Sequence, residues 1–571
     1  MLAPKKYSLA SFVLTRLSLA ASASFLGGCG DEALHIEESG DDSNGDGDGD
    51  GDGDGDGDGD GDGDSVTTWR PFDEDDWARG GIGIDRVVIN QGVSIVLAVD
   101  GTPRPRKDRV TKPVAHRRTA IQAMWKVPGD WQERPILARL QLRQANGSIE
   151  VLETTTTVSG SSTEGSSGAS FSWDIPAEDV FPLMDYSIEL WEAENDHDDI
   201  AASDRAPAMP AADFSDLGIG DAPMKYKVVF VPVEYDHDQG SGCHTSTENL
   251  LADPATIETL VQHYRVQNPV TDVEFSVREA PLVIRSKLGA LNQVNTLQQG
   301  LRFDDFAEPD IYYHAFINVC SNSFCTGAPA SQECLLGVAP GTPPPTKGAG
   351  NSRVAVTVYY DDLAKTAETY VHETGHSQGR PHTACGSGRD RNPDPSYPHN
   401  NGVIGAWGWN IVTGEFYPPN SYVDYMSYCA PTWVSDWTWD KTHDQVRAIS
   451  SWGVEGIDFQ RPDYESSVLL TGTIYKAVDE KNLGQETWWT SRGYVIDEQL
   501  SPGEAVEFYD HSGQWLGVSP ASVTRVEGGG LTIMANAPEF FEDVGQIVRV
   551  SPGIRATVPM AGLEHRIRPL R

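Results

Sequence analysis

Hydrophobic and polar positions alternate over short stretches in the part of the chain that follows residue 85. From Arg86 to about Glu194, β-branched and aromatic runs at 87–89, 94–97 and 138–142 are separated by turns and by a Ser/Gly/Thr-rich loop at 154–170. A period of two with turn residues between the runs is typical of β-strands. The pattern predicts a β-sandwich, followed by an Ala/Pro/Asp-rich linker at 201–223.

A different pattern begins near residue 225. The apolar run 228–232 predicts a buried strand, and the residues 254–264 have the periodicity of an amphipathic helix. Further strands are expected at 310–319, 335–339 and 353–359, and a helix is expected from about 361 to 378. This alternation predicts an α/β segment.

The last part of the chain returns to alternating strands. A helical pattern at 441–452 ends at Gly453, and the residues 466–571 alternate apolar and polar positions between Gly-rich turns. We expect a second β domain there. Neither β region contains a constellation of catalytic residues.

The N-terminal residues have the features of an export signal. Lys5, Lys6 and Arg16 form a basic region, and the apolar stretch 17–26 is too short to span a bilayer. The run 26–29 resembles a bacterial lipobox, which implies cleavage before Cys29 and acylation of that residue. An ordinary signal peptide with a chance cysteine is the alternative.

The acidic residues are concentrated in a segment that cannot fold. Residues 31–64 contain sixteen acids and no Lys or Arg, and they end in ten consecutive Gly-Asp dipeptides. Apart from Ala33, Leu34 and Ile36, this segment has nothing apolar to bury, and its charges repel, so it predicts an extended tether. The whole chain has a net charge of -41, which excludes binding to nucleic acid phosphates. The 15 Trp and 19 Tyr residues nevertheless supply enough apolar surface for real cores.

The cysteines point to the same compartment as the export signal. Besides Cys29 there are six, an even number in an exported chain, so three disulfides are possible. No CxxC pair with zinc-finger spacing is present.

One string of residues carries recognisable chemistry. His372 and His376 are four residues apart in a predicted helix, so both side chains reach one Zn²⁺ from the same face. The Glu373 side chain points about 100° around the helix from His372, so it can contact a water held by the metal without ligating the metal. Gly379 can adopt the positive φ that ends a helix, and the turn brings His382 to the metal as a third ligand.

This HExxHxxGxxH string resembles the metzincin clan of zinc endopeptidases, whose second signature is a turn with a methionine beneath the metal. The residues 424–428 match that turn. The resemblance makes Met426 the methionine of the turn, and it makes Tyr428 a swinging extra ligand that stabilises the tetrahedral intermediate. A packed aromatic residue is the alternative for Tyr428.

The resemblance also implies an edge strand that pairs with the substrate. In metzincins an extended peptide lies along a strand that precedes the active-site helix. The residues that match this strand best are Leu335, Leu336, Gly337, Val338 and Ala339.

The same turn suggests one disulfide. Cys385 lies three residues after His382, and Cys429 lies one residue after Tyr428. If both segments meet the zinc, the two thiols are neighbours and pair in an oxidising compartment.

The resulting fold class is multidomain: an α/β metzincin-like catalytic domain, with a twisted mixed sheet and an active-site helix, flanked by two β-rich, sandwich-like domains. The expected boundaries are 1–28 for the lipoprotein signal peptide, 29–65 for the lipidated cysteine and tether, 66–222 for the first β domain and linker, 223–455 for the protease, and 456–571 for the second β domain.

We expect a zinc-dependent endopeptidase that hydrolyses extracellular proteins or glycoproteins, with Glu373 as the general base. We expect it outside the cytoplasm in the bacterial cell envelope, at the outer membrane or the cell surface, bound to the membrane through the lipid anchor only. The alternative is a surface-anchored binding protein or adhesin that retains the metal site as a scaffold. Retention of Glu373 argues against that alternative, because a pseudo-protease can lose its general base without structural cost.

Overall fold

The computed structural model describes residues 76–565, with gaps. The gaps are residues 167, 195–199, 201–204, 212, 238–242, 321–324, 327–332, 360, 387–392, 454–467, 476–484, 493–494, 496–499, 527–529, 539–540, 559 and 561–562. The expected signal peptide, Cys29 and the Gly-Asp tether lie outside the described residues. The described residues all belong to one compact unit.

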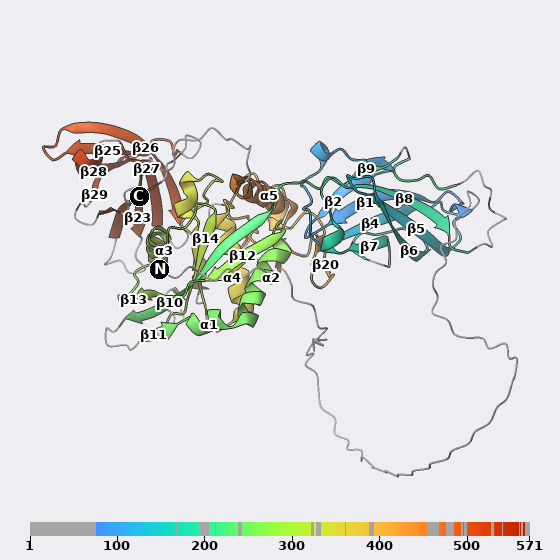
Figure 1. Ribbon diagram of the computed structural model, residues 1–571, viewed down its shortest axis with the longest axis horizontal. Helices are drawn as coiled ribbons and strands as arrows, with labels where there is room; N and C mark the ends of the chain where they lie inside the picture. Colours follow the sequence, from blue (N-terminus) through green and yellow to red (C-terminus); the bar gives the residue numbers. More distant parts are fainter. Residues whose placement is uncertain are drawn as a thin grey trace, which may run out of the picture. The chain divides into compact units, whose positions relative to one another are not determined.

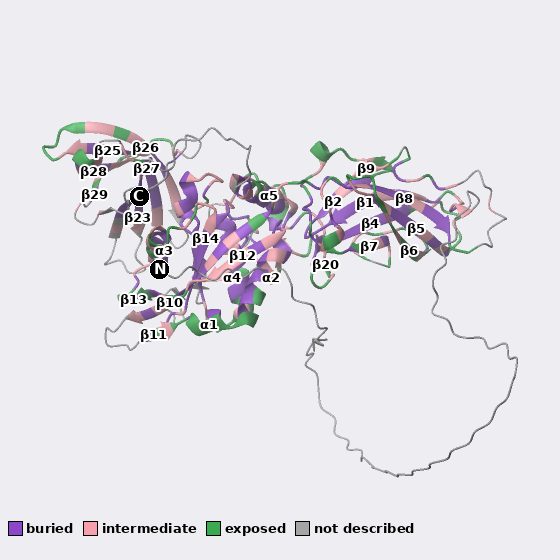
Figure 2. Ribbon diagram, viewed as in Figure 1, coloured by how far each residue is buried: buried purple, intermediate pink, exposed green. Residues whose placement is uncertain are grey.

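The N-terminal part consists of two antiparallel sheets (Figure 1). One has the order β3-β2-β1-β4-β7, and the other has the order β6-β5-β8-β9. Side chains of both sheets belong to one buried cluster, and the strands are largely purple in Figure 2. The strands are β1 (Gly83–Asn90), β2 (Ser94–Val99), β3 (Thr102–Pro103), β4 (Thr119–Lys126), β5 (Arg134–Arg143), β6 (Ile149–Val158), β7 (Phe171–Ile175), β8 (Asp185–Glu192) and β9 (Ser215–Asp216).

The segment expected to be a linker packs against these sheets. It contains β9, which pairs with β8, and its Leu217 and Ile219 side chains are buried. Its apolar residues are too few and too unevenly spaced to give a periodic pattern, so the sequence does not reveal their burial.

A seven-stranded sheet forms the central part. The strands β10, β14 and β18 are parallel neighbours, and β17 pairs antiparallel to β18 at the edge of the sheet. The other members, β11, β12 and β13, all pair with β10. The strands are β10 (Lys225–His237), β11 (Cys243–Ser246), β12 (Asp272–Val277), β13 (Leu282–Ile284), β14 (Ile311–Ile317), β17 (Gly337–Val338) and β18 (Val354–Val358).

Helices cover both faces of this sheet. Residues of α2 and α4 share a buried cluster with Phe230 and Phe316, whereas Val294 of α3 packs with Val231 and Ala315, which lie next to them in the strands. Adjacent strand residues face opposite sides, so the sheet is buried on both faces. The helices are α1 (Glu248–Ala252), α2 (Pro254–Gln267), α3 (Asn292–Asp304), α4 (Leu363–Ser377) and α5 (Asp436–Ser450).

The helix α5 begins five residues before its predicted start. The Ser435 side chain caps it by accepting a hydrogen bond from the backbone N–H of Thr438. Three short ladders lie between the larger elements, and the last of them is parallel. They are β15 (Cys325–Thr326) with β16 (Glu333–Cys334), β19 (Gly408–Trp409) with β20 (Phe416–Tyr417), and β21 (Val423–Asp424) with β22 (Thr432–Trp433).

The C-terminal part is an eight-stranded sheet with its own buried cluster around Trp488 and Phe508. Its order is β29-β28-β25-β26-β27-β23-β24-β30. The strands are β23 (Val468–Tyr475), β24 (Gln485–Arg492), β25 (Ala505–Asp510), β26 (Trp515–Val526), β27 (Gly530–Asn536), β28 (Val544–Ser551), β29 (Ile554–Val558) and β30 (Glu564–His565). Among the described residues, no helix combines the length and the apolar character that a membrane span requires.

The expected fold class, a metzincin-like α/β domain between two sandwich-like β domains, is wrong. The structure is mostly β, with 39% strand against 20% helix, and it includes a half-barrel sheet. The expectation inferred the fold of a whole domain from the one helix that carries the histidine motif. Strands of two residues such as β17 and β21 carry no periodic pattern, so sequence periodicity underestimates how far the chain is organised by strand pairing.

The N-terminal sheets and the central part share one core. The carbonyl of Gly92 accepts hydrogen bonds from the Trp433 indole at 2.8 Å and from the Trp409 backbone at 3.3 Å. The fully buried Arg117 guanidinium donates to the carbonyls of Gln91 and Arg265 at 2.8 and 2.7 Å. Because one side chain satisfies acceptors in both parts, their stabilities are coupled.

We predict that Arg117→Ala lowers the free energy of unfolding by roughly 3 kcal/mol, because it leaves several buried carbonyls without a donor. Urea unfolding followed by tryptophan fluorescence measures this. The matched control is Arg143→Ala, which removes more exposed ion pairs with Asp185 and Asp213 and should cost much less stability. Equal losses for the two variants would contradict the coupling.

Candidate metal centre

The helix α4 brings two histidines to the same face. Asp362 caps its first turn by accepting a hydrogen bond from the backbone N–H of Lys365 at 3.0 Å. One turn separates His372 from His376, and their ring centroids are 4.9 Å apart. The helix therefore presents two imidazoles to one point.

The chain reverses directly after α4. Gly379 has a φ of 82°, and its N–H donates to the His376 carbonyl at 2.8 Å. An L-residue rarely adopts this conformation, and a Cβ at this position would also lie 3.2 Å from the Pro343 carbonyl. The turn brings His382 back, so that its Nε2 lies 3.0 Å from the Nε2 of His376.

The three histidines form a cluster that can hold a metal. One ring nitrogen from each lies within 4.8 Å of the other two, and among the described residues no other group of three potential ligands is found. Two nitrogens bound tetrahedrally at roughly 2.0 to 2.1 Å would be about 3.3 Å apart. The observed 3.0 Å is close to that separation.

Backbone carbonyls select the tautomer of the two helical histidines. The Nδ1 of His372 lies 2.8 Å from the Tyr425 carbonyl, and the Nδ1 of His376 lies 2.7 Å from the Arg380 carbonyl. A carbonyl only accepts, so both Nδ1 atoms carry the proton. Each Nε2 is then left with a lone pair for a metal.

Met426 lies beneath the helix. A Cβ at Gly375 would clash with the Met426 sulfur, so the absence of a side chain there lets α4 rest on this methionine. The Met426 carbonyl also accepts a hydrogen bond from the Thr383 N–H at 3.1 Å. The methionine thus has the helical histidines above it and the segment of His382 beside it.

Asp424 holds the turn that contains Met426. Its carboxylate is fully buried and accepts hydrogen bonds from the N–H groups of Met426 at 2.8 Å and Ser435 at 3.0 Å. Burial raises the pKa of this carboxyl. The sequence analysis gave Asp424 no role. Its position two residues before Met426 was the available signal, because an aspartate often accepts a hydrogen bond from a backbone N–H two residues later.

The Glu373 side chain extends from α4 and lies against Gly337 of the edge strand β17. Its side chain is 2% exposed, and a Cβ at Gly337 would lie 2.6 Å from its Cγ. The sequence did not reveal that Gly337 makes room for this carboxylate. Of the proposed strand 335–339, only Gly337 and Val338 pair regularly, with Thr357 and Val356. Gly337, Val338 and Ala339 are buried, and Leu335 and Leu336 are half-buried.

Tyr428 and a disulfide complete the site. The Tyr428 hydroxyl lies 2.9 Å from the Nε2 of His382. Cys385 and Cys429 form a disulfide with a sequence separation of 44, so the segment after His382 is joined to the segment after Tyr428. A second disulfide joins Cys243 to Cys320.

Another buried histidine supports α4 from behind. His314 on β14 lies 2.9 Å from the Thr357 hydroxyl and 3.5 Å from that of Thr374. Burial lowers the pKa of His314 to about 3, so it is neutral near pH 7. It is not part of the three-histidine cluster.

Comparison with protein families gives one match. Residues 348–431 match the model of the Peptidase M66 family. This match indicates a peptidase, and the matched segment contains the three histidines, Glu373 and the turn with Met426. The metal cluster therefore lies in the segment that the family model describes.

The other comparisons add no functional assignment. No curated protein matches the chain. One solved structure, a cycloisomaltooligosaccharide glucanotransferase from Paenibacillus sp. complexed with cycloisomaltoheptaose, is 11% identical and aligns over 82% of this chain and 72% of its own. Its TM-score of 0.14 is too low to support an argument.

We predict that Asp424→Asn weakens binding of Zn²⁺ about 10- to 100-fold. The Tyr425 carbonyl that orients His372 belongs to the turn that this carboxylate holds, and loss of such outer contacts typically has this effect. Titration against a chromophoric chelator measures the affinity. The control is the exposed Asp444→Asn on α5, and an unchanged affinity in Asp424→Asn would show that the turn holds its shape without the charge.

Proposed function

We propose that this peptidase is a zinc-dependent endopeptidase. The observation that carries the proposal is the placement of Glu373 between a three-histidine cluster and an edge strand. The motif and the turn with Met426 also resemble those of metzincin peptidases. An extended peptide beside β17 would bring a peptide bond next to both the histidines and the carboxylate.

The donor set favours zinc. His372, His376 and His382 offer three neutral nitrogens, which suit Zn²⁺ and leave a fourth position open. When bound, zinc supplies Lewis-acid chemistry: it polarises the scissile carbonyl and lowers the pKa of a water molecule. Two of the three rings are already oriented by backbone carbonyls for this role.

Residues around the cluster transfer protons, stabilise the oxyanion and position the substrate. Glu373 takes a proton from the attacking water and passes it to the leaving amine. The Tyr428 hydroxyl, next to His382, donates a hydrogen bond to the oxygen on which negative charge develops. The strand β17 positions the peptide through its backbone.

A binding protein or adhesin with a retained metal scaffold is the rival proposal. Such a protein has no need of a carboxylate at the metal, whereas here Glu373 is buried and Gly337 leaves space for it. Hydrolysis of a non-peptide substrate is disfavoured by the family match, which is to a peptidase.

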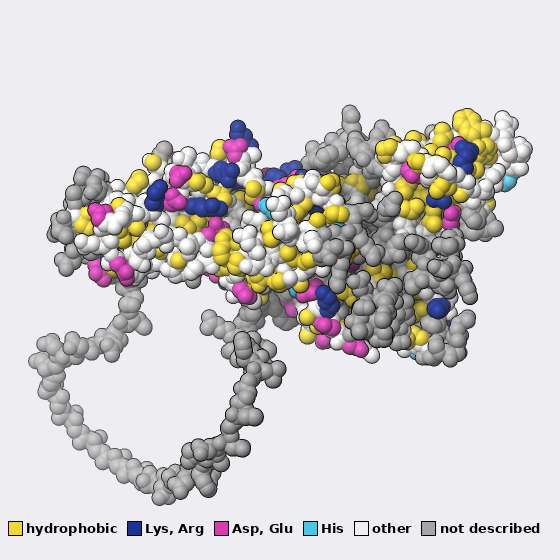
Figure 3. Space-filling model, turned by 180° about the vertical axis from the view of Figure 1, so that it is seen from behind, with side chains coloured by type: hydrophobic (Ala, Val, Ile, Leu, Met, Phe, Trp, Pro, Cys, Tyr) yellow, Lys and Arg dark blue, Asp and Glu magenta, His cyan; other side chains and the backbone are white. Residues whose placement is uncertain are grey.

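We further propose that the enzyme acts outside the cytoplasm, on extracellular proteins or glycoproteins, with Cys29 as its lipid anchor in the cell envelope. The two disulfides support an oxidising compartment. On the face in Figure 3, described basic side chains lie beside acidic ones, which suits a protein substrate better than a nucleic acid.

We predict that Glu373→Gln abolishes proteolysis while it preserves the fold and zinc binding, because the carboxylate is a base and not a ligand. Peptide hydrolysis and bound metal are measured on the same preparation. The matched control is Glu368→Gln, which alters an exposed carboxylate of the same helix paired with Lys365. Activity of Glu373→Gln within tenfold of the parent would refute the assignment.

We predict that Tyr428→Phe lowers kcat by at least about tenfold and changes KM much less, because the hydroxyl acts on the transition state. Steady-state kinetics separate the two constants. Tyr417→Phe, which removes a phenol bonded to Asn410 and Glu415, is the control. An unchanged kcat would assign Tyr428 to packing alone.

A further inference from the structure

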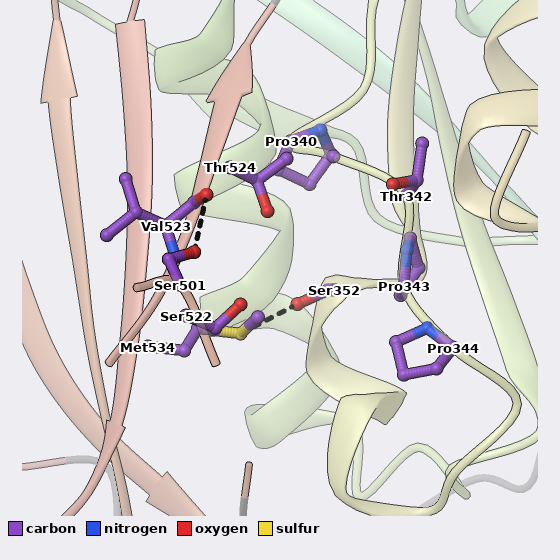
Figure 4. Close-up of a pocket in the computed structure, with 11 residues that line it drawn as sticks. Pro340, Thr342, Pro343, Pro344, Ser352, Ser501, Ser522, Val523, Thr524 and Met534 are labelled. Atoms are coloured by element: carbon purple, nitrogen blue, oxygen red, sulfur yellow. Dashed lines mark hydrogen bonds between the residues drawn. The ribbon is translucent and has the colours of Figure 1, made fainter. Parts of the chain in front are cut away.

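A pocket of about 270 Å³ lies between the segment that follows β17 and the C-terminal sheet (Figure 4). One wall is the segment 340–344 together with Ser352. The opposite wall is formed by Ser501, by the residues 522–524 of β26 and by Met534 of β27. The pocket is separate from the histidine cluster. Neither the match to the Peptidase M66 family nor the histidine motif assigns the pocket a role.

Specific contacts hold the wall 340–344 in place and join it to the opposite wall. The Pro343 carbonyl accepts a hydrogen bond from the Gln445 side chain at 3.1 Å, and Arg353 donates to the Pro344 carbonyl at 2.9 Å. Across the pocket, the Ser352 hydroxyl lies 3.2 Å from the Met534 sulfur. One contact therefore joins the two walls, and Gln445 and Arg353 fix the wall formed by 340–344.

The position of the pocket relates it to the peptide-binding edge. Gly337 of β17 lies against Glu373, and Pro340 begins the pocket wall three residues later. Three residues span at most about 10 Å. An extended peptide advances about 3.4 Å per residue, so a substrate paired with β17 reaches the pocket with its third or fourth residue from the scissile bond.

The lining of the pocket defines what it can accept. Its residues are prolines, hydroxyl-bearing side chains, a glycine, Val523 and Met534, and none of them is charged. A charged side chain would lose its hydration there without gaining a partner. The lining therefore suits an uncharged side chain that is apolar or carries a hydroxyl.

We propose that this pocket is a substrate subsite of the peptidase. It binds the uncharged side chain of the third or fourth residue on the N-terminal side of the scissile bond. The N-terminal side follows from antiparallel pairing with β17, which is the more stable arrangement and directs the start of the peptide toward Pro340. The inference rests on the proposed endopeptidase function, and it gives the C-terminal sheet a part in substrate selection.

The test uses the metal-loaded parent enzyme and peptides that share one cleavage site. A long peptide extends five residues to the N-terminal side of the scissile bond, and a short one extends two. We expect kcat/KM to be at least about tenfold higher for the long peptide. Replacing its third or fourth residue with Lys or Asp should remove that advantage, whereas the same changes on the C-terminal side should not.

A variant provides the second arm. Ser522→Lys places a positive charge in the pocket, and it should lower kcat/KM for the uncharged long peptide while leaving the short peptide unaffected. An Asp at the third or fourth residue of the peptide should then restore cleavage. Val518→Lys, at an exposed position on the same strand, is the matched control and should behave as the parent.

The outcomes separate the two proposals. A parent enzyme that cleaves neither peptide contradicts the proposed function. A parent that cleaves both peptides equally well, or that loses activity only when charges lie on the C-terminal side, overturns the subsite. Because the parent alone decides these points, the test does not depend on the folding of Ser522→Lys.

Discussion

Two hydrogen bonds from imidazole to backbone carbonyl govern this site. They fix the proton on Nδ1 of His372 and His376, and with it the direction of the lone pairs on Nε2. The acceptors belong to Tyr425 and Arg380, so the geometry of the ligands depends on the turn after α4 and on the turn around Met426. The buried carboxylate of Asp424 and the disulfide of Cys385 stabilise these same two segments.

The support of the site extends into the N-terminal sheets. Asn268 accepts a hydrogen bond from the Tyr425 hydroxyl at 3.1 Å, and it lies in the loop whose Val270 carbonyl accepts from Arg117. The Gly92 carbonyl accepts a hydrogen bond from Trp433 of β22, and β22 pairs with β21, which contains Asp424. Contacts of the N-terminal part therefore reach the turn around Met426 through two short routes. Its contribution to the peptidase is mechanical support, which a folded sheet supplies without any catalytic residue of its own.

The sequence predicted the grouping of the three histidines better than it predicted the architecture. The spacing of His372, Glu373 and His376 is read directly from helix geometry, and Gly379 marks the reversal because few other residues tolerate its φ. The roles of Gly337 and Asp424 depend on contacts between segments far apart in the chain, which no local pattern encodes. The mainly β fold was missed for the same reason, since strands of two residues are defined by their partners.

The brevity of β17 has a consequence for solubility. A long exposed edge invites pairing with the edges of other molecules. Here the regular ladder lasts only from Gly337 to Val338, and prolines occupy positions 340, 343 and 344 shortly after it. Proline lacks the N–H that would extend a ladder. The edge is thus too short to form a long ladder with a second copy of the chain.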